Sequence, residues 1–166
     1  YHEWLGLVEE KGIKCTPAHA GQQLDLGGGA VIEVLNPPES LFSGTESDVN
    51  NNGVVLRLSL GKASFLLTSD IMWEAEFDLI ARCGLASTVL KAAHHGSDTS
   101  TTPEFLSAVN PEVAVISVGK DNKFGHPAPE LMERLKDKVG WQDIYRTDEQ
   151  GTIEFITDGA RLWVKD

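Results

Sequence analysis

ASFLLTSD at Ala63–Asp70 and STVLKAAHHGSDTSTT at Ser87–Thr102 are two apolar runs, and each stops abruptly at ionisable side chains. If both runs are strands and the segment between them is a helix, the carboxyl ends of the strands are neighbours in space. A pair of histidines followed by Gly96, beside an aspartate that ends the neighbouring strand, is typical of a metal-binding cluster. The two runs therefore predict an α/β fold with a site at one edge of its sheet.

The segments around these runs predict a mixed sheet with helices packed outside it. Val54–Leu60 alternates apolar and polar side chains, and Gly61 and Lys62 join it to Ala63–Thr68 as a hairpin. Further strands are expected at Ala30–Leu35, Thr88–Ala93, Val113–Val118, Ile144–Arg146, Ile153–Thr157 and Arg161–Lys165, and helices at Tyr1–Glu10, Met72–Arg82, Thr102–Val109 and Pro129–Val139. Strands that alternate with helices between flanking hairpins favour a mixed sheet over a purely parallel one.

Three local expectations rest on weaker signals. The glycine-rich Gly21–Gly29 predicts a turn-rich connector, and the polar Leu41–Asn52 predicts a loop. In the helix expected at Met72–Arg82, helical spacing places Phe77, Ile80 and Ala81 toward the core.

The composition fits one globular, soluble domain over residues 1–166, with 41% hydrophobic and 23% charged residues. The net charge of −11 disfavours nonspecific binding to a polyanion. No run of about 18 uninterrupted apolar residues occurs, and the first residues, YHEWLGLVEEKG, are acidic where a signal peptide is basic. Because the chain starts inside an expected helix and without an initiator methionine, we expect it to be a piece of a longer polypeptide.

Several classes of function lack their sequence signals. Neither GxGxxG nor GxxxxGK[ST] occurs, so no nucleotide cofactor is expected. No serine lies in a GxSxG elbow, which argues against serine-hydrolase chemistry. The two cysteines, Cys15 and Cys83, are interpreted as isolated thiols.

Each candidate site residue also has an ordinary structural alternative. Asp70 can cap the helix that follows it, and the pair His94 and His95 can be one core histidine and one solvated histidine. His126, between Gly125 and Pro127, can be a surface histidine of a loop.

Five blocks of sequence, in order, carry a resemblance to a known family: SDVNNNGVVLRL, SFLLTSDI, VLKAAHHGSDTSTTPEFL, VNPEVAVISVGKDNKFGHP and YRTDEQGTIEFITDG. From about Ser47 to Gly159 the chain resembles the C-terminal metallo-β-lactamase-like domain of the ComEC/Rec2 DNA-uptake proteins. The resemblance implies an αββα sandwich of two mixed β-sheets with helices outside, here truncated at its N-terminus. It also implies a nuclease that depends on divalent manganese or zinc and acts on incoming DNA, single-stranded or otherwise. The partner implied within the same polypeptide is a membrane channel, with this domain on the external face of a bacterial cytoplasmic membrane.

The resemblance assigns roles to individual residues. Asp70 matches an aspartate that bridges two metals, His94 is the better match for a metal-ligating histidine, and His95 is the weaker one. His126 is implied near the scissile phosphate, as the acid that protonates the leaving group. Substrate contacts are implied for Ser97, Ser117, Asn122 and Lys91.

One expected motif is missing from the chain. The HxHxDH-like segment, which supplies most metal ligands in the superfamily, has no counterpart here, because His2 and His19 stand alone. Since zinc usually needs about four ligands, we expect this chain alone to bind metal weakly or not at all and to have little activity. Two alternatives stay open: a phosphocholine-esterase-like phosphoester hydrolase, and a non-catalytic docking or structural domain of the uptake channel.

Overall fold

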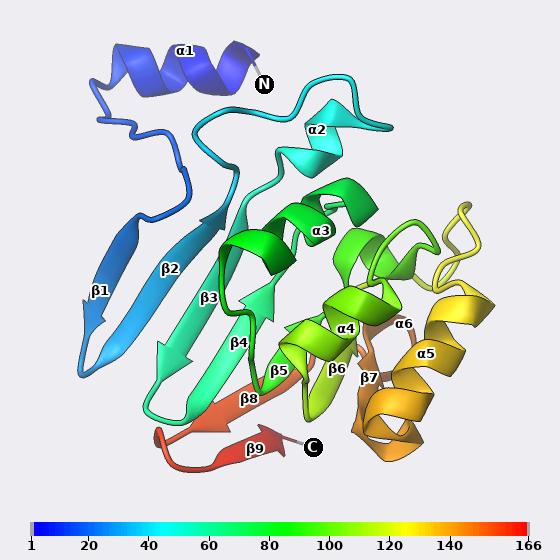
Figure 1. Ribbon diagram of the computed structural model, residues 1–166. Helices are drawn as coiled ribbons and strands as arrows, with labels where there is room; N and C mark the ends of the chain where they lie inside the picture. Colours follow the sequence, from blue (N-terminus) through cyan, green and yellow to red (C-terminus); the bar gives the residue numbers. More distant parts are fainter. Residues whose placement is uncertain (1, 166) are drawn as a thin grey trace.

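The computed structural model describes residues 2–165 and contains a mixed α/β fold with two sheets (Figure 1). The larger sheet has seven strands in sequential order. They are β1 (Gln23–Gly27), β2 (Ala30–Asn36), β3 (Val55–Leu60), β4 (Ala63–Leu67), β5 (Val89–Lys91), β6 (Val113–Ile116) and β7 (Ile144–Arg146). The second sheet pairs β8 (Glu154–Thr157) with β9 (Leu162–Lys165).

The type of strand pairing changes once across the larger sheet, at β4. The pairs from β1 to β4 are antiparallel, and those from β4 to β7 are parallel. The tight turn at Gly61 and Lys62 forces the antiparallel pairing of β3 with β4, and Leu60 lies opposite Ala63. From β4 onward a helix separates most successive strands, and a helical crossover returns the chain in the parallel direction.

Three helices cover one face of this sheet (Figure 1): α3 (Trp73–Arg82), α4 (Pro103–Val109) and α5 (Pro129–Val139). Their apolar sides and the inward side chains of the strands form one core, which includes Leu66, Leu79, Leu90, Phe105, Ile116 and Leu131. The hairpin β8–β9 contacts the other face, because the Phe155 ring lies 5.7 Å from Phe65 and 6.0 Å from Tyr145. This layering is compatible with the expected αββα sandwich, although the second sheet is an antiparallel pair rather than a mixed sheet.

Three shorter or peripheral α-helices and two 3₁₀ turns complete the described fold. They are α1 (His2–Glu10), α2 (Asp48–Asn51), α6 (Thr147–Gln150) and the 3₁₀ turns Ala93–Gly96 and Trp141–Asp143. Tyr1, the expected start of the first helix, lies outside the described residues. Across residues 2–165, no helix has both the length and the apolar character needed to cross a membrane.

Two of the weaker local expectations are wrong. The expected connector contains β1, which pairs with β2 through the Gly28–Gly29 turn, so backbone pairing outweighs the low strand preference of its glycines. The expected loop contains α2, which Ser47 caps by accepting a hydrogen bond from the Asn50 N–H.

The inner face of α3 also differs from the expectation. Ala75, Glu76 and Leu79 are buried, whereas Phe77 is 44% exposed and Ala81 is exposed. Phe77 lies instead on the outer surface, where its ring contacts Trp73 edge to face at 6.3 Å. The inner side of α3 therefore carries a buried carboxylate, and of the three residues expected to face inward only Ile80 packs against the core.

Candidate functional site

The ionisable residues at the ends of β4 and β5 meet in space, as the sequence predicts. Because β4 and β5 are parallel, their carboxyl ends lie at one edge of the sheet, and the His94 N–H donates to the Ser69 carbonyl at 3.1 Å. Ser69, His94 and His95 all adopt left-handed backbone conformations, with φ of 52°, 49° and 55°. Such conformations are uncommon for these residue types, and here they produce two tight turns that face each other.

His95 is the histidine that lies beside Asp70. The His95 Nε2 atom is 3.4 Å from Asp70 Oδ1, and both side chains are partly exposed. The other ring nitrogen, Nδ1, lies 2.7 Å from the Ser117 carbonyl oxygen, which can only accept, so Nδ1 carries the proton. With Nδ1 protonated, Nε2 is the ring nitrogen through which His95 can bind a metal ion shared with Asp70.

His94, the better match by resemblance, points elsewhere. Its Nδ1 lies 3.5 Å from Thr99 Oγ1, and its ring lies 6.0 Å from the ring of His126. Burial, reinforced by the charges of His94 and His95, lowers the pKa of His126 below its ordinary value. The structure thus places all three histidines around one small region, with His95 on the Asp70 side and His126 on the His94 side.

Asp70 does not cap the following helix. The N-cap position of α3 is Met72, and no side chain bonds to the first turn there. The capping alternative for Asp70 is therefore wrong, and the carboxylate is left directed at His95.

Asn122 holds the loop that carries His126. Its Oδ1 accepts from the backbone N–H of His126 at 3.0 Å and of Phe124 at 3.2 Å. Its Nδ2 donates to the carbonyls of His126 at 2.7 Å and Gly119 at 3.1 Å. Because the amide bonds to the loop itself, this geometry gives Asn122 a role in positioning His126.

The other residues implied in substrate contact lie near the pair but differ in their accessibility. Ser97 is buried and shares a hydrogen bond with Thr99 at 3.0 Å, while Ser117 contributes its backbone carbonyl to His95. Lys91 is half-buried; burial lowers its pKa, and the charge of Asp70 acts in the opposite direction.

A loop of hydroxyl residues, Ser97–Thr102, ties the aspartate turn to the histidine turn. Ser100 Oγ donates to the Ile71 carbonyl at 2.7 Å, next to Asp70. Thr101 Oγ1 accepts from the Ala93 N–H at 3.2 Å, next to His94. Thr102 at the end of this loop also caps α4, because its hydroxyl accepts from the Phe105 N–H at 3.2 Å.

Glu76, which is not among the predicted site residues, anchors this loop from inside the core. Its side chain is fully buried, and its two oxygens accept from the backbone N–H groups of Thr101 and, at 2.8 Å, Thr102. Burial raises the pKa of Glu76, while those hydrogen bonds and the charge of Arg134 act against the rise. The signal that could have revealed it is an acid at a position where helical spacing expects an apolar residue.

The described residues do not complete a metal site. Within residues 2–165, no group of three or more His, Cys, Asp or Glu side chains is arranged to hold a metal ion. Asp70 and His95 provide two potential ligands, and a stable zinc site usually has about four. The residues present therefore fit part of a metal centre, not a whole one.

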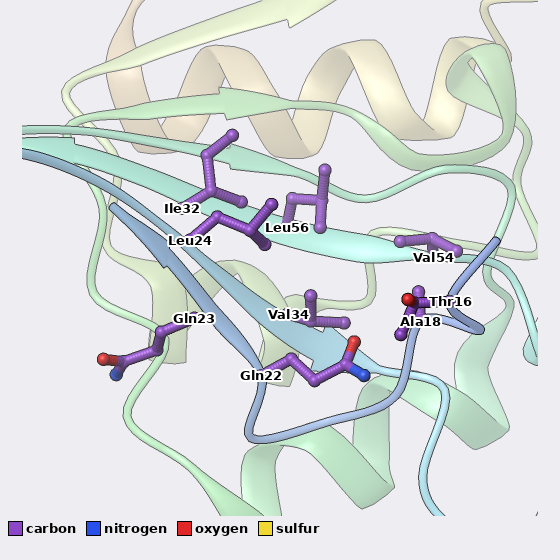
Figure 2. Close-up of a pocket in the computed structure, with 9 residues that line it drawn as sticks. All are labelled: Thr16, Ala18, Gln22, Gln23, Leu24, Ile32, Val34, Val54 and Leu56. Atoms are coloured by element: carbon purple, nitrogen blue, oxygen red, sulfur yellow. The ribbon is translucent and has the colours of Figure 1, made fainter. Parts of the chain in front are cut away.

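A cavity of about 570 Å³ lies away from these residues on the open face of β1–β3 (Figure 2). Figure 2 shows Leu24, Ile32, Val34 and Leu56 projecting from the strands into it, with Gln22 and Gln23 at one side. None of its lining side chains is ionisable, so it offers no acid, base or metal ligand. The candidate acid and imidazole groups lie instead at the Asp70–His95 edge.

Three curated proteins are similar to this chain over most of its length. It is 36% identical over 152 residues to ComE operon protein 3 of Bacillus subtilis, covering 91% of this chain and 19% of that protein. It is 35% identical over 139 residues to competence protein ComA of Neisseria gonorrhoeae, covering 82% and 19%. It is 38% identical over 134 residues to Recombination protein 2 of Haemophilus influenzae, covering 81% and 16%. No family model matches the chain.

These similarities define the chain as a domain related to competence proteins. The chain belongs to the ComEC/Rec2 family. It spans about a fifth of the length of these relatives, so it corresponds to one part of a much longer protein in each of them.

Proposed function

We propose that the chain takes part in the hydrolysis of DNA phosphodiesters during DNA uptake, with Asp70 and His95 as two ligands of a divalent metal centre. The observation that carries the proposal is the approach of His95 Nε2 to Asp70 Oδ1 at 3.4 Å while the Ser117 carbonyl holds Nδ1. Metal-ligating histidines usually donate their second N–H to a carbonyl or carboxylate, as His95 does. One relative is named a competence protein and another a recombination protein. These names support DNA as the substrate.

His126 is assigned the transfer of a proton to the leaving oxygen. Asn122 fixes the backbone of His126 on both its N–H and its carbonyl, and the imidazole faces the ring of His94. A histidine held by its own backbone keeps its ring in one place, as proton transfer to a bound phosphate requires.

The number of metal ligands determines how much activity we expect from the chain alone. Because two ligands are too few for tight binding, we expect this chain alone to bind manganese or zinc weakly and to degrade DNA slowly or not at all. The same incomplete set favours one alternative, in which the domain has no catalytic role and docks other parts of the uptake channel.

The proposed partners follow from the competence relationship. They are DNA, and membrane channel segments of the same polypeptide, at the external face of a bacterial cytoplasmic membrane. A divalent ion would also reduce the repulsion between DNA and a chain of net charge −11. No nucleotide cofactor is proposed.

The test compares the activity of variants at the two proposed ligands with that of a variant at an exposed aspartate outside the site. Manganese-dependent degradation of single-stranded DNA is measured for the full-length protein that carries the chain, with Asp70→Ala, His95→Ala and, as a control, Asp137→Ala at an exposed position of α5. We expect the first two variants to lose activity and the control to keep it. An Asp70→Ala protein with full activity would favour the docking role. Robust cleavage by the chain alone, lost in Asp70→Ala, would show that these residues form a complete site.

A further inference from the structure

An exposed aromatic ring stands beside the candidate site. Phe124 is 81% exposed in the loop that leads from β6 into α5, the yellow segment of Figure 1. Its ring stacks on that of His126, with centroids 5.8 Å apart and planes inclined by 18°. The Phe124 N–H is also held by Asn122 Oδ1 at 3.2 Å. The ring is therefore fixed on one face and open to solvent on the other.

A small cavity connects this ring to the histidines. Its volume is about 210 Å³, and its surface is almost wholly apolar apart from the two imidazoles. It is lined by His95, Val118, Gly119, Asn122, Phe124 and His126. The cavity therefore reaches from Phe124 to the histidine that lies beside Asp70.

The charge around Phe124 differs from that of the whole chain. Lys120 and Lys123 are exposed residues of the same loop, with Asp121 as the acid between them in sequence, in a chain of net charge −11. Exposed lysines next to an open aromatic face are the combination by which proteins bind single-stranded nucleic acid: the cations attract phosphates and the ring stacks a base.

We propose that the open face of Phe124 stacks a nucleobase of a single-stranded nucleic acid, which places the adjoining phosphate toward His126 and His95. This inference deepens the proposed function and rests on it for the identity of the substrate. A base paired inside a duplex has no free face to offer, so the stack selects single strands or frayed ends. Phe124 is then a substrate-binding residue of the site.

The test measures binding rather than cleavage. Dissociation constants of the chain are measured by fluorescence anisotropy for a labelled oligothymidylate and for the same oligonucleotide with abasic sites in place of its bases. We expect wild type to bind the base-bearing strand about tenfold more tightly than the abasic strand. Phe124→Ala and Phe124→Leu should remove this difference, and Phe124→Trp should keep it. Trp141→Ala is the matched control, because Trp141 is 54% exposed but follows the other end of α5.

Each outcome separates this inference from the proposed hydrolysis. Equal affinity of wild type for the two strands, or full discrimination by Phe124→Leu, would overturn the stacking role even in a protein that hydrolyses DNA. Discrimination that depends on the aromatic ring at position 124 would support it even if no hydrolysis is found in the full-length protein.

Discussion

Glu76 is the buried residue whose removal tests how the site is held together. Its carboxylate accepts from the backbone N–H groups of Thr101 and Thr102, and Thr101 in turn accepts from Ala93 beside the histidine turn. Glu76→Ala leaves both N–H groups without a partner in a buried loop. It also removes the negative charge that Glu76 places near Arg134, which donates to the Ser100 carbonyl at 3.2 Å.

The cost can be worked out from these contacts. Each orphaned buried donor costs about 1–3 kcal/mol, so the two N–H groups together account for about 2–6 kcal/mol. We therefore expect Glu76→Ala to lower the free energy of unfolding by about 3–5 kcal/mol, out of the roughly 5–15 kcal/mol typical of a domain. Glu76→Gln should cost less, about 1–2 kcal/mol, because its amide oxygen can still accept one of the two N–H groups.

Urea unfolding followed by circular dichroism measures these differences. The control is Glu130→Ala, which changes an exposed acid in the first turn of α5 and should alter the free energy of unfolding by no more than about 0.5 kcal/mol. A Glu76→Ala protein within about 1 kcal/mol of wild type would refute the reasoning, since two buried donors cannot be orphaned so cheaply.

The pH dependence of Glu76 gives an independent reading of the same burial. Because burial raises the pKa of Glu76, the folded protein holds its proton more tightly than the unfolded chain does. Its contribution to the free energy of unfolding is full below the unfolded pKa, about 4.3, and declines as pH rises through the higher folded pKa. Glu76→Gln cannot titrate, so the difference between wild type and Glu76→Gln should shrink as pH rises through this range.

Three further predictions concern single positions. Gly96 has a φ of 87°, and an added Cβ would lie 2.8 Å from Pro127 Cβ. Gly96→Ala should therefore lower the free energy of unfolding, measured by denaturation, by about 2–4 kcal/mol. Gly84→Ala is the control and should be near neutral, because no atom lies within 4 Å of its added Cβ. Phe155→Ala should loosen the β8–β9 hairpin from Phe65, seen as faster amide hydrogen exchange across residues 154–165 with unchanged protection of β5. The Thr45 hydroxyl, with the N–H groups of Thr45 and Gly44, lowers the pKa of Asp48. The stabilising effect of the Asp48 carboxylate should therefore be lost as pH falls below the ordinary aspartate range. Asp48→Asn should remove that part of the acid sensitivity of unfolding.

Much of the architecture follows from local patterns, and the exceptions have physical causes. The Gly61–Lys62 turn, the Thr102 cap and the apolar runs of β4 and β5 are local signals that tertiary structure did not override. Glu76 was not found because its partners, Thr101 and Thr102, lie far along the chain and meet it only after folding. Phe124 was not found because one aromatic residue in a polar loop has no periodicity to interpret.

The register of the parallel strands explains both what could be predicted about the site and what could not. Leu67, Lys91 and Val115 lie side by side across β4, β5 and β6, so the chain leaves all three strands at one level. That level brings Asp70, His95 and the Ser117 carbonyl together, and rules about where apolar runs end are enough to predict a cluster there. The choice between the two histidines depends on something else.

Two successive left-handed residues decide which histidine faces Asp70. With φ of 49° at His94 and 55° at His95, the backbone turns so that the second ring, not the first, points across β4 to the carboxylate and back to Ser117. Left-handed backbone at non-glycine residues is set by the tertiary contacts that fix it, here the His94 N–H bond to the Ser69 carbonyl and the contacts of Gly96 with its neighbours. No periodicity encodes such a turn. The resemblance aligns His94 with a ligand position, whereas the structure turns His95 toward Asp70. The two assignments differ by one residue because the backbone conformation of this turn depends on the folded chain.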